Sequence, residues 1–134
     1  MPEELQPAAV SAGFLWAGRI ITGLVALFMA LDGGAKLFSP TPVVEASEKL
    51  GIAKSQLFGI GVLLLACTML YVIPQTSVLG AILLTAFLGG ATAIHVRAES
   101  GAFPIAFSVA FGGLAWLGLV LRDPRLFWMI VGRS

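Results

Sequence analysis

Residues 57–94 decide the fold: they read LFGIGVLLLACTMLYVI at 57–73, PQTS at 74–77 and VLGAILLTAFLGGATAI at 78–94. Two apolar runs of 17 residues, neither with a charged side chain, are thus joined by a link of four residues. A helix of about 17–25 apolar residues crosses the hydrocarbon core of a bilayer. Because lipid offers no hydrogen-bonding partner to an open backbone, each run is expected to be helical. The short link predicts that the two helices pack antiparallel.

Two further apolar runs flank this pair, at 14–31, where only Arg19 interrupts it, and at 103–121. Hydrophobic residues make up 58% of the chain, charged residues 11%, and the mean hydropathy is +0.98. A soluble domain carries about 25% charged residues, so this composition excludes a soluble protein, and it is too apolar for a disordered chain. The sequence therefore predicts an all-α integral membrane four-helix bundle that forms a single domain over residues 1–134.

The long link between the first and second spans, residues 32–56, predicts a short amphipathic helix. Thr41 is placed to cap its N-terminus with Pro42 at the first helical position, and Gly51 suits its C-terminal end. One face of this helix is apolar and consists of Val43, Ala46 and Leu50. We expect the helix to lie on the membrane surface or to pack against the bundle.

A second amphipathic segment follows the fourth span. Pro124 ends that span, and the apolar tail 124–134 is too short to cross a bilayer, so an interfacial C-terminal helix is expected. Four spans place both termini on one side of the membrane. The arginines directly after the last span favour the cytoplasmic side of a plasma membrane, the inner membrane of a bacterium.

Small residues indicate how the spans pack. The third span carries a ridge of them at a spacing of four: Ala81, Thr85, Gly89 and Ala93. Helices in lipid associate through close contact, which small residues permit, so this ridge predicts a seam that holds the bundle together. The alternative is that Gly89 and Gly90 leave room for a flat ligand or for a helix of a partner.

One charge lies inside the first span. Arg19 is five residues into its apolar run, about 8 Å below the start at 1.5 Å per residue. Either its side chain extends back to the headgroups, or it pairs with Asp123, the Tyr71 hydroxyl or Gln75 on the same side.

The most polar part of the sequence comes from the ends of two spans. Asp32 and Lys36 follow the first span at i and i+4, the order that favours an ion pair on a helix. His95 and Arg97 end the third span, which the topology brings to the same side of the membrane. These four residues are the candidate ligand-binding residues, for a lipid headgroup, the polar head of a quinone or a proton. The alternative is an ion-pair rim between adjacent helices.

Several functions find no support in the residues. No catalytic residue is nominated, because Cys67 lies mid-span and His95 at the edge of the next span, where they cannot meet. No metal site is expected, because these are the only histidine and the only cysteine. The net charge of +1 without a basic run argues against nucleic acid. No cofactor is expected, although a quinone or a lipid would be compatible.

Three stretches resemble DoxX-like membrane proteins: RIITGL with LDGGAKL at 19–24 and 31–37, YVIPQTSVLGAILLTAFLGGATAIHVR at 71–97, and WLGLVLRDP at 116–124. The resemblance implies a small four-span bundle, mostly bacterial, with relatives linked to redox chemistry as a component of a thiosulfate:quinone oxidoreductase or as a membrane partner of oxidative-stress enzymes. It implies no agreed catalytic residues. Two departures remove polar groups from the interior: LFGIGV at 57–62 lacks the glutamate often found there, and Phe87 stands near the expected tyrosine.

Two functions follow as expectations. The first is a non-catalytic membrane subunit or scaffold of a larger, redox-linked assembly, whose partners are the lipid bilayer and other membrane protein subunits or further copies of the chain. The second is a binder of a quinone or another lipophilic molecule with a redox accessory role. A transporter is disfavoured because no charged residue lies at mid-depth to mark a pathway.

Overall fold

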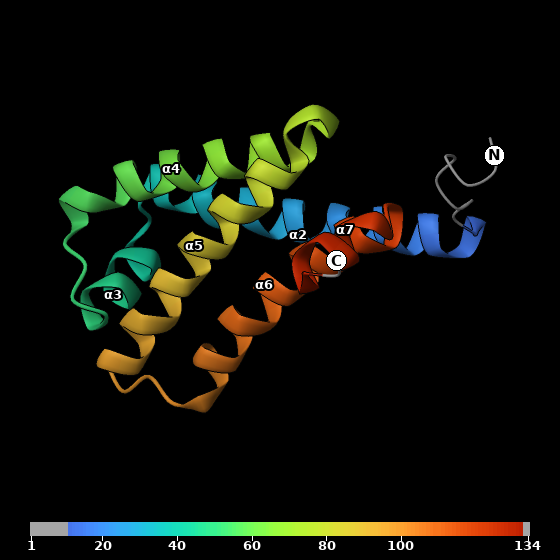
Figure 1. The fold of residues 1–134 in the computed structure, drawn as a ribbon. Coiled ribbons are helices and arrows are strands. Elements are labelled where there is room, and N and C mark those ends of the chain that lie inside the picture. The colour runs from blue at the N-terminus through green and yellow to red at the C-terminus, as the bar shows by residue number, and fades with distance from the viewer. Residues whose placement is uncertain (1–10, 133–134) are drawn as a thin grey trace, which may run out of the picture.

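A computed structural model describes residues 11–132, which contain helices and no strand. The elements are α2 (Ala12–Phe38), α3 (Thr41–Lys49), α4 (Lys54–Val72), the 3₁₀ turn η1 (Pro74–Thr76), α5 (Ser77–Arg97), α6 (Ala102–Arg122) and α7 (Arg125–Val131). Four of these helices, α2, α4, α5 and α6, are long and apolar enough to cross a membrane. The predicted all-α membrane bundle is confirmed (Figure 1).

The four long helices pack around one core. Helix α2 contacts α4 and α6, and α5 contacts the same two neighbours, so each helix packs between two others (Figure 1). Fully buried side chains from all four helices meet inside, among them Val25, Leu64, Leu84 and Ala115. The buried Tyr71 hydroxyl donates a 2.7 Å hydrogen bond to the Ala115 carbonyl, which joins α4 to α6. Tyr71 therefore takes part in interhelical packing and is no partner for Arg19.

Helix α2 is longer than its apolar run predicts. It continues past 31 through Asp32, Gly33 and Gly34 to Phe38, so the Asp32–Lys36 pair lies on a helix. The reason is the crossing of α2 and α4, where a Cβ on Gly61 would lie 2.7 Å from the Gly33 carbonyl oxygen. The two backbones can come this close only because neither residue has a side chain.

A second glycine pair joins α2 to α6 near the opposite end of α2. A Cβ on Gly18 would lie 2.8 Å from the Gly118 carbonyl oxygen and 2.7 Å from Cγ of Arg122. Close by, the Arg19 guanidinium lies 5.3 Å from the centre of the Trp16 ring, a cation–π contact. Two of the polar partners proposed for Arg19 bind other groups: Asp123 pairs with Arg125, and the Tyr71 hydroxyl donates to the Ala115 carbonyl.

The small-residue ridge of α5 takes part in the predicted seam only at Ala81 and at Thr85, whose hydroxyl accepts a 2.7 Å hydrogen bond from Trp116 Nε1 of α6. Ala81 is buried, but Thr85, Gly89 and Ala93 are exposed on the outside of the bundle. The buried face is offset by one residue and consists of Ser77, Gly80, Ala81, Leu84 and Leu88. In a membrane both faces of a helix are apolar, so spacing alone does not identify the face that packs against protein.

Gly80 is the residue on which the α4–α5 hairpin depends. A Cβ at this position would overlap backbone atoms of Tyr71 and Leu70 on the neighbouring helix. The turn above it is held by the Thr76 hydroxyl, which donates to the Leu70 carbonyl at 2.7 Å. The predicted antiparallel pair therefore exists, with its closest contact at a glycine that the pattern did not single out.

The short helix α3 starts at Thr41, one residue before the expected first position at Pro42, so Thr41 is not its N-cap and no side chain caps it. Pro40 takes the N-cap position and Pro42 lies in the first turn. Gly51 adopts a left-handed conformation with φ of 81° just after the C-cap Leu50, which fits its expected role at the helix end. The helix packs against α4 rather than standing away from the bundle (Figure 1).

The C-terminal helix α7 is short and mostly exposed, with Leu126 alone among its residues packing against the core. Asp123 organises the turn before it: its carboxylate accepts hydrogen bonds from Arg125 N at 3.2 Å, Nε at 3.0 Å and Nη2 at 3.1 Å. These bonds hold the pKa of Asp123 below its usual value. The exposed apolar face of α7 fits the predicted interfacial helix, whose last two residues, 133 and 134, lie outside the described part of the chain.

Candidate ligand cavity

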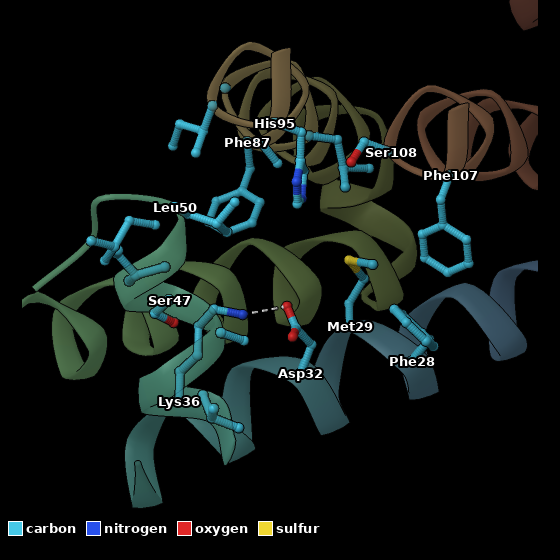
Figure 2. A pocket seen from close by; sticks show the side chains of 18 of the residues that line it. Phe28, Met29, Asp32, Lys36, Ser47, Leu50, Phe87, His95, Phe107 and Ser108 are labelled. Carbon is cyan, nitrogen blue, oxygen red and sulfur yellow. Dashed lines mark ion pairs between the residues drawn. The ribbon is translucent and has the colours of Figure 1, made fainter. Parts of the chain in front are cut away.

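A cavity of about 580 Å³ lies at the end of the bundle away from Ser11 and Gly132. Residues from α2, α3, α4, α5 and α6 line it, so it is a partly open cavity between the bundle and the short helix (Figure 2). Most of the lining is apolar: Phe28 and Met29 come from α2, Leu50 follows α3, and Phe87 lies on α5. The apolar face of α3 thus covers one side of the cavity.

Two charged residues of α2 form an ion pair in this cavity. Lys36 Nζ lies 2.7 Å from Asp32 Oδ2, one helical turn away. The Lys36 side chain is the more enclosed of the two, with 17% of its surface exposed against 40% for Asp32. Pairing removes most of the penalty of holding either charge next to apolar walls. The expected i, i+4 pair therefore forms, and it borders the cavity (Figure 2).

His95 enters the same cavity from α5. Its ring lies in the last turns of that helix and points toward the space that the Asp32–Lys36 pair borders from the other side (Figure 2). The ring Nδ1 is 3.1 Å from the hydroxyl oxygen of Ser100, in the loop between α5 and α6. That contact leaves Nε2, at the far edge of the ring, as the nitrogen available to a ligand.

Arg97 does not join the other three candidate residues. Its side chain is exposed and it does not line the cavity. Two residues along a helix rotate the side chain by about 200°, so His95 and Arg97 point to different sides. The structure therefore brings Asp32, Lys36 and His95 to one cavity and leaves Arg97 on the outside.

Several cavity residues carry no signal in the sequence. Ser47 of α3 and Ser108 of α6 are both 6% exposed, and the Ser108 hydroxyl donates to the Pro104 carbonyl. Phe107 of α6 faces Phe28 of α2, with ring centres 5.4 Å apart. Which of the many apolar or small residues line the cavity depends on how the helices cross, and the sequence alone does not show this. Of the two adjacent glycines of α5, Gly90 lines the cavity and Gly89 does not.

The phenylalanine contact shows how α2 and α6 diverge. At Gly18 and Gly118 the two helices touch through their backbones, whereas beside the cavity Phe28 of α2 packs against Phe107 and Phe111 of α6, and Phe103 continues the row of rings on the exposed side of α6. These rings, Phe28 of α2 with Phe103, Phe107 and Phe111 of α6, lie 4.7 to 5.8 Å apart in successive contacts. The wall of the cavity toward α6 is therefore made of side chains and not of packed backbone.

The cavity combines a few polar groups with mainly apolar walls. It offers a paired carboxylate, an ammonium group and an imidazole against apolar walls, an arrangement typical of a site for a mainly apolar molecule with a small polar head. Among residues 11–132, no three metal-ligating side chains of the His, Cys, Asp and Glu types come together. Cys67, the free thiol, is buried in α4 outside the cavity.

The fold and this cavity define a small integral membrane protein of the four-helix type with a ligand-sized space at one end of its bundle. The chain belongs to the DoxX-like family, whose model matches residues 20–118, about three quarters of the sequence. The match includes Asp32, Lys36 and His95 and ends before α7. No curated protein and no solved structure matches the chain.

Proposed function

We propose that the protein binds a lipophilic molecule with a carbonyl- or hydroxyl-bearing head, of the quinone type, in this cavity. The observation that carries the proposal is the cavity itself: about 580 Å³ lies within the range of about 300–1,000 Å³ typical of small-molecule sites. Its walls are apolar, and its polar groups converge from two helices. Ion pairs that only join adjacent helices would need no cavity beside them. The cavity therefore favours the ligand-binding function over the function as a membrane subunit or scaffold.

The position of the polar groups supports a ligand with a head and a tail. Asp32, Lys36 and His95 lie in the last turns of α2 and α5, where these helices approach the membrane surface. Phe28 and Met29 border the same cavity about one turn deeper along α2. A bound molecule would therefore place its polar head at the interface and its apolar part toward the bilayer centre. A redox accessory role, which the family resemblance suggests, would belong to such a ligand.

Native mass spectrometry of the full chain in nanodiscs tests the proposal. The wild-type protein is titrated with a short-chain benzoquinone, and the adduct is counted per chain. We expect one quinone per chain, and about a tenfold weaker affinity in His95→Ala, the effect of one lost hydrogen bond to a ligand. Arg97→Ala is the matched control, because Arg97 lies two residues away on the same helix but outside the cavity.

The outcomes separate the proposal from nonspecific partitioning. Retained binding in Arg97→Ala with a loss in His95→Ala supports the site. Equal adducts in both variants would mean that the quinone enters the lipid or the detergent belt, which contradicts the proposal. A phospholipid mass that no quinone displaces would assign the cavity to lipid instead.

The second candidate is the subunit or scaffold role in a larger assembly. It is favoured by the outer face of α5, where Thr85, Gly89 and Ala93 are exposed and a Cβ on Gly89 would meet nothing within 4 Å. Small residues on a lipid-facing side let another helix approach closely. Gly89→Leu is expected to remove a co-purifying membrane subunit while quinone binding persists. If the chain extracted from its own membrane carries no partner, this role fails.

A further inference from the structure

Ser100 holds His95 at two points. The Ser100 hydroxyl oxygen lies 3.1 Å from His95 Nδ1, and the Ser100 backbone N–H donates to the His95 carbonyl at 3.1 Å. A third bond, from Glu99 N–H to the Val96 carbonyl at 3.2 Å, completes a Schellman cap at the end of α5. Glu99 takes the left-handed position of that cap, with φ of 53°. The backbone therefore fixes where the Ser100 hydroxyl sits relative to the ring.

The contact with this hydroxyl bears on which nitrogen of a neutral His95 ring carries the proton. A neutral imidazole has one N–H donor and one acceptor nitrogen, whereas a hydroxyl has a single proton to donate. Within residues 11–132, the hydrogen bond recorded for the Ser100 hydroxyl is the one to Nδ1. If the hydroxyl donates to Nδ1, both groups are satisfied. If Nδ1 donated instead, the hydroxyl proton would find no acceptor in the hydrogen bonds of the described residues and would have to turn to water.

We propose that Ser100 is a positioning residue that keeps the proton of His95 on Nε2, so that the cavity binds a ring with two carbonyl oxygens in preference to the corresponding dihydroxy ring. Nε2–H then donates into the cavity from α5, and the Lys36 ammonium, which has two protons beyond the one directed at Asp32, donates from α2. A dione accepts from both walls. This inference rests on the proposed function, whose ligand it specifies as the oxidised form.

The charge of Asp32 does not reverse this preference. Its Oδ2 is engaged by Lys36 at 2.7 Å, and its Oδ1 keeps acceptor capacity on the α2 side of the cavity. The preference is therefore set on the α5 side, by His95. A hydroxyl group of a dihydroxy ring placed opposite His95 Nε2–H could only accept there and would have to direct its own proton elsewhere, whereas a carbonyl oxygen has no proton to place.

The tautomer can be read from the protein without any ligand. His95 is the only histidine of the chain, so histidine labelled with ¹⁵N gives the signals of one imidazole. At mildly alkaline pH, where free imidazole is neutral, we expect the nitrogen shifts and couplings of a ring protonated on Nε2. Ser100→Ala is expected to give a mixture of tautomers, and Ser100→Thr, which keeps a hydroxyl, to restore the wild-type spectrum.

The preference is measured by anaerobic titration of the full chain in nanodiscs with decylubiquinone and, separately, with its chemically reduced form. We expect the wild type to bind the oxidised form about tenfold more tightly, as one hydrogen bond predicts. In Ser100→Ala this ratio is expected to approach one, and Ser100→Thr to restore it. Glu99→Gly is the matched control, because it keeps the cap and the hydroxyl and is expected to leave the ratio unchanged.

Failure of this inference can be told apart from failure of the proposed function. A ring protonated on Nδ1, or equal binding of the two forms by the wild type, overturns the role of Ser100 while the cavity remains a quinone site. No saturable binding of either form overturns both. If Ser100→Ala does not fold, the wild-type spectrum and the Ser100→Thr ratio decide the matter.

Discussion

The two ends of the bundle are built from different kinds of contact. At the end near Ser11 and Gly132, helices touch through backbone, at Gly18 with Gly118 and at Gly80 with Tyr71. At the other end α2 still touches α4 through Gly33 and Gly61, but side chains separate it from α5 and α6, and a cavity opens. The close helix contacts thus depend on glycines, which have no side chain, whereas the cavity depends on the side chains that separate the helices. Substitutions at the backbone contacts should therefore affect folding, whereas substitutions of the side chains that line the cavity should affect binding.

The largest effect is expected for Gly80→Ala. The added Cβ would overlap backbone atoms of Tyr71, which no side-chain rearrangement relieves, so the α4–α5 hairpin has to separate. We expect a loss of more than about 4 kcal/mol of unfolding free energy, the range of severe core defects, seen as loss of monodisperse protein in detergent. Gly89→Ala, on the same helix but in open space, is the control and should keep the wild-type melting temperature or raise it. Equal stability of both variants would contradict the comparison.

A smaller effect is expected for Gly61→Ala. Its Cβ would lie 2.7 Å from the Gly33 carbonyl oxygen and 3.1 Å from Cβ of Lys36, so α2 and α4 must move apart. We expect a loss of about 1–3 kcal/mol, as for other overpacked contacts, measured by reversible unfolding in mixed micelles. Gly59→Ala lies on the same helix with nothing within 4 Å of its Cβ. A wild-type melting curve for Gly61→Ala would show that this contact adjusts freely.

Glu99→Gly is expected to stabilise the cavity end. Glu99 has φ of 53°, a left-handed conformation that strains residues with a Cβ and that glycine adopts readily. Part of this gain is offset because glycine is more flexible in the unfolded chain, so we expect about 0.5–1 kcal/mol. Thermal unfolding measures the change. A lower melting temperature would mean that the Glu99 side chain contributes more than its backbone costs.

The smallest effect concerns the turn between α6 and α7. Arg125 lowers the pKa of Asp123, chiefly through its side-chain hydrogen bond, so the carboxylate stabilises the folded turn. This contribution is complete above the unfolded pKa of an aspartate, about 4, and is lost as the pH falls through the lower, folded value. We expect Trp128 fluorescence to change as the pH falls below about 4 in the wild type. Asp123→Asn should remove that transition, and a transition above pH 5 would contradict this assignment.

The spans could be predicted because a bilayer fixes their length. Residues 57–73 and 78–94 match α4 and α5 to within a few residues at each end. The apolar run predicts too short a first span because Gly33 and Gly34 weaken an isolated helix, whereas in the bundle the contact with Gly61 requires a glycine at position 33. The length of this helix depends on contacts between residues far apart in the sequence, and a local sequence pattern carries no information about such contacts.

The site could be predicted only in part, for a similar reason. Topology alone brings Asp32, Lys36 and His95 to one end of the bundle, since the first and third spans end on the same side. Whether they border an ion-pair rim or a cavity depends on how far α5 and α6 diverge from α2. Ser100 carried no signal either, because its contact with His95 exists only once the cap of α5 has formed.

The length of α2 makes bilayer thickness a variable of this site. Its 27 residues extend for about 40 Å, whereas the hydrocarbon core is about 30 Å thick. Asp32 and Lys36 lie in its last two turns, so a thin bilayer leaves the ion pair among headgroups and water, and a thick one draws it toward the acyl chains. Hydrophobic mismatch would then change the surroundings of the polar head of a ligand without any change in the protein. Acyl-chain length therefore has to be held constant wherever affinities for this cavity are compared.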